Sequence, residues 1–197
     1  LEGETRDSRV DTAKGALRAR LPDWPANSLE KHLRCAEASY WLAYNTDQLV
    51  RHAEIVCEVA IRGDRFGCEI IADPHRNVME LTVYGVDQVG FFRRITGALA
   101  AAGANVLDAK VSTFNNGMAL DTILFRNALG VLYYNNDSRL ARLEKSVIRS
   151  VRGGGWGGAF SIKRVGSRHT EMFNVTPRVL IDNNASHSHT VVEINGL

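Results

Sequence analysis

The sequence lacks any apolar run long enough to cross a membrane, and it has only 3 cysteines and 4 prolines among 197 residues. A membrane-spanning helix needs about 18 or more consecutive apolar residues, and a secretory leader needs a charged segment before an apolar one; neither pattern occurs. Cys35, Cys57 and Cys68 are odd in number and lack CxxC spacing, which argues against a disulfide framework. We therefore expect a cytoplasmic protein without membrane contact.

An excess of charge of one sign is also lacking. The 24 lysines and arginines are well mixed with 22 aspartates and glutamates, for a net charge of +2. No single-sign field is available to hold a phosphate backbone, so nucleic acid is not an expected partner. The composition, 45% hydrophobic and 23% charged, is that of an ordinary globular protein with one core or two small units. Because the chain begins at Leu1 rather than Met, we expect it to be a piece of a longer protein.

The first part of the chain is helical in pattern. Residues 1–25 are charged and alanine-rich until Pro22 and Pro25 interrupt them, as in the tail of a preceding domain or a linker. Residues 26–76 are predicted to form a helical connector and a lead-in strand, whose apolar faces need a covering surface. The expected helix caps are Asn27 or Ser28, for a helix to about Ser39, and Thr46, and the expected anchors are Trp24 and Trp41.

Residues 77–182 have the pattern of an α+β domain. Strands are predicted at 68–72, 78–85, 104–114, 119–125 and 177–183, and helices at 90–103 and from Asp137 to Gly153. Asn115-Asn116-Gly117 predicts a hairpin between the third and fourth strands. The residues expected to face the core from the helices are Phe92, Ile95, Leu99, Ala102, Leu140, Leu143, Val147 and Val151. From residue 77 the order is βαββαβ, which predicts a ferredoxin-like plait with two helices on one face of an antiparallel sheet.

Two further segments surround the predicted last strand. The run "GGGWGG" opens an insertion at 153–176, and because it leaves a helix instead of entering one, a surface insertion is favoured over a phosphate cradle. The alternating strand "HTVVEINGL" is expected to begin another unit, residues 183–197, which the sequence does not complete. This strand should lie along its own chain or be exchanged between two copies.

The loop within "VYGVDQVGFFRR" carries the candidate chemistry, and the plait admits three functions. An acylphosphatase-like enzyme would cradle phosphate between Gly85 and Arg93, but the spacing is one residue short and Arg93 is turned about 100° around the helix. An RNA-binding plait would need paired exposed aromatics on its central strands, and these are missing. The third function is ligand sensing by an ACT domain.

The string "GFFRRITGALAAAGANVLDAKVSTFNNGMALDT" closely resembles the first ACT domain in the C-terminal regulatory region of the bifunctional PII uridylyltransferase/uridylyl-removing enzymes. Five more segments resemble the same family in the right order: "LPDW", "HLRCAEASYWLAY" and "LVRHAEIV" before the domain, "PRVLIDNNAS" at its closing strand and "SHTVVEING" at the start of a second ACT domain. The resemblance covers most of residues 17–197. It implies an α+β, ferredoxin-like βαββαβ ACT domain preceded by a helical connector and followed by the first strand of a second ACT domain.

The resemblance also implies a function. The parent enzyme would be a nucleotidyltransferase that attaches uridylyl groups from UTP to the PII signalling protein, and a phosphodiesterase that removes them when glutamine is plentiful; Mg²⁺ is implied for that parent. This chain lacks the nucleotidyltransferase carboxylates and the His-Asp metal motif, so we expect no catalysis and no cofactor here. The expected partners are glutamine, PII, the catalytic domains of the parent chain, and a second copy of the chain. The alternative is an interaction module without a ligand.

The residues that the resemblance assigns to the ligand are Asp87, Gln88, Val89, Gly90, Phe91 and Asn105. Gly90 would let a carboxylate approach the helix N-terminus, and Asp87 could pair with an α-amino group. The simpler alternative is that Asp87 only caps the helix and Gly90 only turns the chain. The family pattern Asp-x-Pro-Gly lacks its proline here, which leaves the loop less rigid.

Other polar residues have simpler interpretations. His187 and His189 share a strand face but have no evident third metal ligand. Asp121 and Glu144 have no visible partner and are expected on the surface. The basic residues Lys163, Arg164 and Arg168 lie in the long insertion and are expected to be solvated or to contact another domain.

Overall fold

The computed structural model describes residues 5–127, 137–152, 178–182 and 191–195. The described residues belong to two units, whose bounds along the chain are residues 1–160 and 161–197. The domain boundaries predicted at residues 25, 76 and 182 stay predictions, and the insertion at 153–176 lies outside the described residues.

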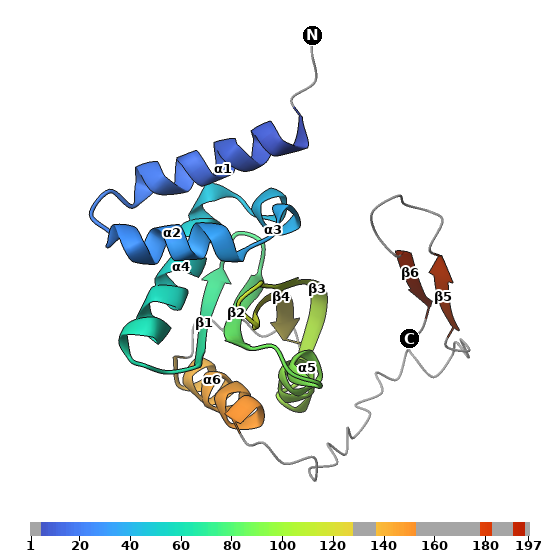
Figure 1. Cartoon of the computed structure of the whole chain (residues 1–197). Coiled ribbons are helices and arrows are strands. Elements are labelled where there is room, and N and C mark those ends of the chain that lie inside the picture. Colours follow the sequence, from blue (N-terminus) through green and yellow to red (C-terminus); the bar gives the residue numbers. More distant parts are fainter. Residues whose placement is uncertain (1–4, 128–136, 153–177, 183–190, 196–197) are drawn as a thin grey trace. The chain divides into compact units, whose positions relative to one another are not determined.

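A four-stranded antiparallel sheet is the centre of the first unit. Its order is β1-β2-β4-β3, and its strands are β1 (Phe66–Asp73), β2 (Val78–Val86), β3 (Ala104–Thr113) and β4 (Met118–Asn127). The β1–β2 turn is held by Asp73, whose Oδ1 accepts from the N–H groups of His75 and Arg76. The predicted β3–β4 hairpin is confirmed, with Gly117 at φ +76°. The sheet is covered on both faces, as Figure 1 shows.

Two helices cover one face: α5 (Phe91–Ala101) and α6 (Asp137–Arg152). The core between these helices and the sheet includes Ile95, Leu99, Leu143, Val147 and Val151, as predicted. The prediction for Phe92 is wrong, because Phe91 points inward instead and Phe92 is 38% exposed. Ala102 is exposed as well, since α5 ends before it. Gly103, at φ +73°, closes the helix as predicted.

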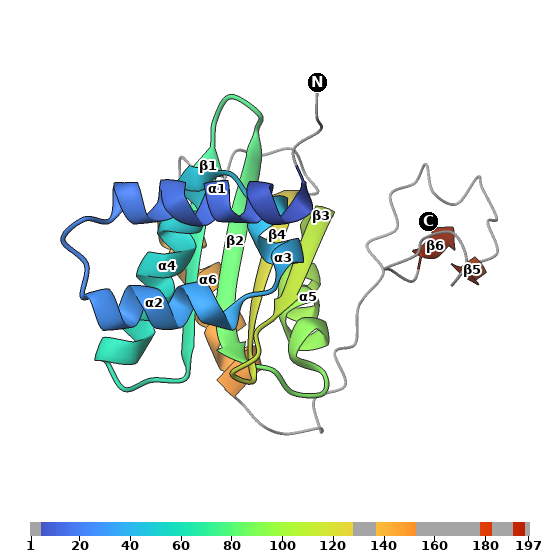
Figure 2. The ribbon, with the colours of Figure 1, turned by 45° about the horizontal axis from the view of Figure 1, so that its top comes forward.

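The predicted connector covers the opposite face (Figure 2). The connector predicted at residues 26–76 supplies α2 (Ala26–Cys35), α3 (Ala38–Ala43) and α4 (Thr46–Ile61). The helix α1 (Arg6–Arg20) comes from the predicted tail, residues 1–25, and packs into the same core through Val10 and Leu17. The cap predictions are wrong by one to three residues: α2 starts after Pro25 without a side-chain cap, and Asn45, not Thr46, forms a capping box with Gln48. The helix α2 also ends at Cys35 and not at about Ser39. Trp41 is buried and Trp24 donates to Cys57 Sγ at 2.9 Å, which confirms both as anchors.

One strand of the plait differs from the prediction. The segment β2-α5-β3-β4-α6 has the expected order and confirms the α+β, ferredoxin-like class. The place beside β2, where a βαββαβ plait puts its last strand, belongs to β1. The predicted last strand, β5 (Arg178–Asp182), pairs in the second unit with β6 (Val191–Asn195). The strand β6 therefore lies along its own chain, one of the two arrangements expected.

Candidate functional site

The candidate site is the loop between the end of β2 at Val86 and the start of α5 at Phe91. Gly90 is the N-cap of α5 and has φ +83°, and no side chain caps this helix. The N–H of Arg94 donates to the carbonyl of Gly90, so the N–H groups of Phe92 and Arg93 have no acceptor within the helix. A Cβ added to Gly90 would meet no atom within 4 Å. The helix N-terminus is therefore open to a small anionic group.

Asp87 joins this loop to the sheet. Its N–H donates to the carbonyl of Gly117 at 2.9 Å, and its Oδ2 accepts from Thr113 Oγ1 at 3.3 Å. The carboxylate lies beside the end of β3 and makes no capping hydrogen bond to α5. The simpler alternative, that Asp87 serves as the helix cap, is wrong for this structure.

Asp121 was predicted to lie on the surface, and this prediction is wrong. It is 1% exposed in the centre of β4, and neither carboxylate oxygen has a hydrogen-bond partner of normal geometry. Burial raises the pKa of Asp121 to about 7, the negative charge of Asp87 adds to the rise, and the backbone N–H of Ser112 offsets part of it. In the sheet register Asp121 lies between Val83 and Val111, on the face that α5 and α6 cover. Two carboxylates therefore lie near the loop.

A signal for Asp121 was present in the sequence. Ala119, Ile123 and Phe125 alternate along β4 and are all buried on the face covered by α5 and α6. Asp121 occupies the inward position between Ala119 and Ile123, so the period of two places a carboxylate in the core. Glu144, the other residue expected on the surface, is half-buried on α6.

The structure brings together five of the six predicted ligand residues. Gln88 and Val89 are exposed, and the N–H of Phe91 donates to the carbonyl of Gln88 at 2.9 Å. The side chain of Phe91 is buried against Gly85 and belongs to the core, so only its backbone faces the loop. Asn105 is exposed at the start of β3, eight residues from Thr113, which places it roughly 26 Å from Asp87. The same plait cannot bring Asn105 to the loop.

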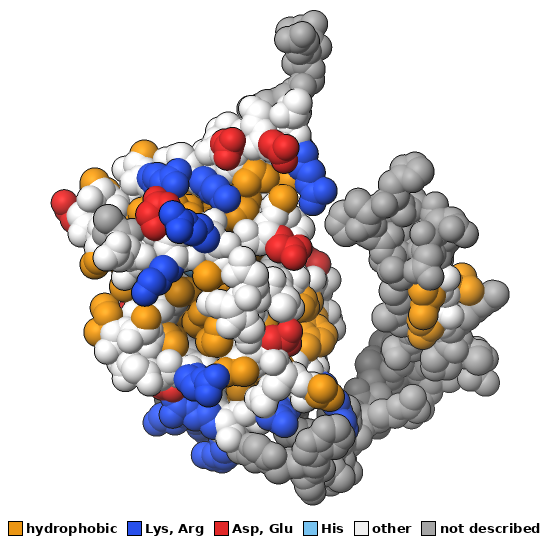
Figure 3. Space-filling model, viewed as in Figure 1, with side chains coloured by type: hydrophobic (Ala, Val, Ile, Leu, Met, Phe, Trp, Pro, Cys, Tyr) orange, Lys and Arg blue, Asp and Glu red, His pale blue; other side chains and the backbone are white. Residues whose placement is uncertain are grey.

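An open hollow of about 570 Å³ lies on the other side of the loop. Arg65, Arg94 and Arg152 line it together with Gln88 and Val89. Arg152 pairs with Asp64, and Arg94 Nη1 donates to the carbonyl of Val151 at 3.3 Å. The loop thus has carboxylates toward β3 and arginines toward α6. Elsewhere on the first unit, acidic and basic side chains are interspersed on the face that Figure 3 shows.

The described residues contain neither a cluster of metal-ligand side chains nor a membrane-spanning helix. Within residues 5–127, 137–152, 178–182 and 191–195, no three His, Cys, Asp or Glu side chains lie together as metal ligands would. His187, His189, Lys163, Arg164 and Arg168 lie outside these ranges. No helix in the described part of the chain is long and apolar enough to span a bilayer.

Comparison with known proteins agrees with this geometry. The ACT-domain family model matches residues 79–150, from β2 into α6. Bifunctional uridylyltransferase/uridylyl-removing enzymes of Azospirillum brasilense and Rhodospirillum rubrum are each 38% identical over 100% of the chain, and that of Gluconobacter oxydans is 36% identical over the same share. The chain spans 21% of the length of each relative. It is therefore an ACT-domain region of the kind found in bifunctional uridylyltransferase/uridylyl-removing enzymes.

Proposed function

We propose that this chain is a regulatory region that senses a free amino acid, glutamine by the family resemblance, at the loop of residues 87–91, and that it catalyses no reaction itself. The open N-terminus of α5 beside the carboxylate of Asp87 supports this proposal most directly. An amino acid carries both an anionic and a cationic group. The helix N–H groups suit the first and Asp87 the second, with the buried Asp121 adding negative potential behind it.

A second plait would complete the site. β3 is an edge strand, and its exposed apolar residues Val106, Leu107 and Val111 suit pairing with another strand. A symmetric antiparallel pairing of two β3 strands centred on Ala109 would place Asn105 of one copy beside Thr113 of the other. That arrangement brings Asn105 to the Asp87 loop across an interface. A single copy is half a site and should bind glutamine in the millimolar range.

The relatives suggest what the sensor controls. Their names describe uridylyl transfer and uridylyl removal. We propose that both activities act on the PII protein in the longer enzyme, and that glutamine bound in this region shifts the balance between them. We also propose that Mg²⁺ acts in the catalytic domains of that enzyme. The alternative, an interaction module without a ligand, is favoured by the same exposed β3 edge.

Glutamine titration followed by amide NMR distinguishes the two functions. In the 197-residue chain we expect shifts centred on Asp87, Gly90 and Phe92 that saturate at millimolar glutamine and that tighten as the protein concentration favours dimers. Asp87→Asn should weaken binding about tenfold, whereas Asp11→Asn, on the exposed surface of α1, should not change it. Glutaramate, which lacks the α-amino group, should bind Asp87→Asn and wild type equally weakly. Dimerisation without any loop shift would establish the interaction module instead.

A further inference from the structure

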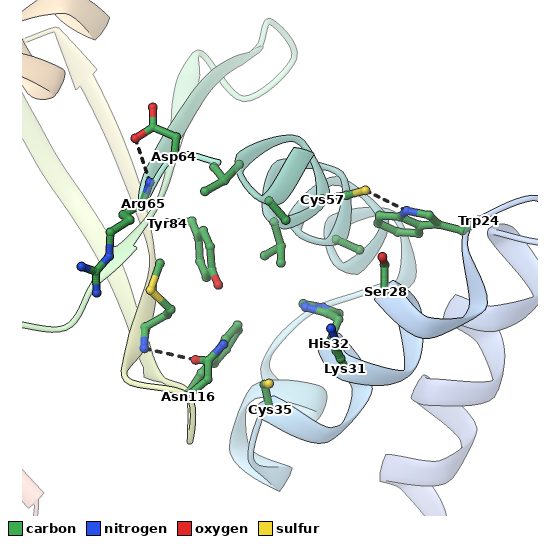
Figure 4. A pocket seen from close by; sticks show the side chains of 16 residues that line it. Trp24, Ser28, Lys31, His32, Cys35, Cys57, Asp64, Arg65, Tyr84 and Asn116 are labelled. Atoms are coloured by element: carbon green, nitrogen blue, oxygen red, sulfur yellow. Dashed lines mark hydrogen bonds between the residues drawn. The ribbon is translucent and has the colours of Figure 1, made fainter. Parts of the chain in front are cut away.

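A cavity of about 330 Å³ lies between the connector and the sheet, on the face opposite α5 and α6. Its walls come from α2, α4, the face of β2 that the connector covers and the β3–β4 hairpin. Figure 4 shows their side chains. Most of the lining is apolar, including Trp24, Ala53, Val59, Phe114 and Met118. Three charged residues also line it: Lys31 and Arg65, which are exposed, and Asp64, which is half-buried and paired with Arg152. The family resemblance assigns none of these residues to a ligand.

His32 is the polar group in this cavity that lacks a partner. Its side chain is 5% exposed, and neither Nδ1 nor Nε2 has a hydrogen bond to the described part of the protein. Burial lowers the pKa of His32 to about 4, so the ring is neutral at pH 7 and carries one N–H donor and one bare nitrogen acceptor. A buried donor and acceptor left unsatisfied cost about 1–3 kcal/mol each. A polar atom of a molecule bound in the cavity would form a hydrogen bond with the ring and offset part of this cost.

The surrounding rings hold His32 in place without satisfying it. Tyr40, Trp41 and Phe114 meet the imidazole edge to face, with ring centroids 5.8 to 6.0 Å away. The neighbouring histidine, His52, is different: its Nδ1 lies 3.1 Å from Tyr40 Oη, and its Nε2 lies 3.5 Å from Thr122 Oγ1. The contrast shows that hydroxyl groups of this core can satisfy a buried histidine, and that they do not satisfy His32.

We propose that this connector cavity binds a small, uncharged, largely apolar molecule with a hydroxyl or amide group, and that His32 makes the polar contact. An apolar chamber with a few polar groups is the usual composition of a small-molecule site. A neutral imidazole offers both hydrogen-bond roles to one hydroxyl, which donates to the bare nitrogen or accepts from the N–H. Because α2 and α4 supply one wall and the ACT sheet the other, an occupant would stabilise the contact between the connector and the ACT domain.

Phenol and toluene are matched probes for this site, since they differ by a hydroxyl in place of a methyl. We expect phenol to bind the 197-residue chain about tenfold more tightly than toluene and to shift the His32 ring nitrogens in long-range ¹H–¹⁵N spectra. His32→Phe keeps a ring of similar size and should abolish or reverse the preference for phenol, because the phenol hydroxyl then has no hydrogen-bond partner in the cavity. His75→Phe, in the exposed β1–β2 turn, should keep the preference for phenol. Equal affinity of wild type for the two probes, or His32 ring nitrogen shifts that phenol does not change, would overturn the proposal. The cavity would then hold only water.

A second measurement needs no variant. Cys35 and Cys57 line the cavity, whereas Cys68 lies on β1 and packs against the α5–α6 core. Saturating phenol should slow N-ethylmaleimide alkylation of Cys35 and Cys57 at least threefold and leave Cys68 unchanged, as measured by peptide mass spectrometry. Equal rates with and without phenol at all three cysteines would contradict an occupant in the cavity. Glutamine should not protect any of them, so this test is independent of the ligand loop.

Discussion

The ring of Phe91 lies directly over Gly85: a Cβ on Gly85 would come within 2.8 Å of Phe91 Cε2 and 2.9 Å of its Cζ. Both residues are buried, and the same added Cβ would lie 3.3 Å from Phe66 Cδ2, so two aromatic rings crowd this position. We expect Gly85→Ala to lower the free energy of unfolding by about 1–3 kcal/mol through overpacking. Urea denaturation measures the loss. Gly15→Ala is the matched control, because an added Cβ meets nothing within 4 Å and alanine favours the helix α1 by up to about 1 kcal/mol.

Asp121 should make stability fall as the pH rises. Its pKa is about 7 in the folded protein and 3.8 ordinarily, so folding favours the protonated carboxyl. The unfolded chain ionises first, and the protein should lose up to about 4 kcal/mol between about pH 4 and about pH 7, with no further loss above. The difference in unfolding free energy between Asp121→Asn and wild type should grow over this range, as urea titrations at several pH values would show. Asp11→Asn should show no such trend, and a flat difference for Asp121→Asn would contradict a raised pKa.

Glutamine binding near Asp121 should release protons. An ammonium group paired with Asp87 offsets the negative charge that helps to raise the pKa of Asp121, so this pKa falls and at pH 7 a fraction of a proton leaves on binding. Calorimetry in buffers of different ionisation enthalpy should give apparent binding enthalpies that differ between buffers for wild type. For Asp121→Asn the enthalpies should agree. Agreement between buffers for wild type as well would place the ammonium group away from Asp121.

Valine at Gly90 should abolish glutamine binding. Gly90 and Gly63 both have positive φ, +83° and +62°, and both have open space where a Cβ would lie. A β-branched residue in this conformation is strained by about 1–3 kcal/mol, so both Gly90→Val and Gly63→Val should lose similar stability in urea titrations. Only Gly90→Val should lose the glutamine-induced NMR shifts, because its side chain fills the approach to α5. Loss of the glutamine-induced NMR shifts in both variants would indicate a general effect of destabilisation.

The spacing of apolar residues predicted most of the helices and strands, because this spacing is a property of short segments of the sequence. The alternation of "VMELTVYG" and the spacing of Leu140, Leu143, Val147 and Val151 each need one covered face, and the structure supplies one. Phe91 and Phe92 show the limit. Both are apolar and adjacent, and only the angle at which α5 leaves Gly90 decides which of them points to the sheet.

The candidate site divides in the same way. The glycine before a helix and the family resemblance together predicted the loop of residues 87–91 as a ligand site. The burial of Asp121 was not predicted, since it depends on the layer that α5 and α6 form over β4. His32 is similar: nothing in "EKHLRC" distinguishes it from an exposed histidine. Its isolation follows from three aromatic rings and a cavity contributed by distant segments.

By itself the sequence determined the α+β class, the helical connector, the hairpin at Gly117 and the loop that carries Asp87 and Gly90, because periodicity and turn chemistry are properties of short segments. Only the tertiary structure decided that β1 takes the edge beside β2, that β5 pairs with β6, and that the connector covers the second face of the sheet. Several strands have edges and apolar faces that suit more than one partner. Which partner they take depends on the packing of the whole chain, through contacts between residues far apart in the sequence.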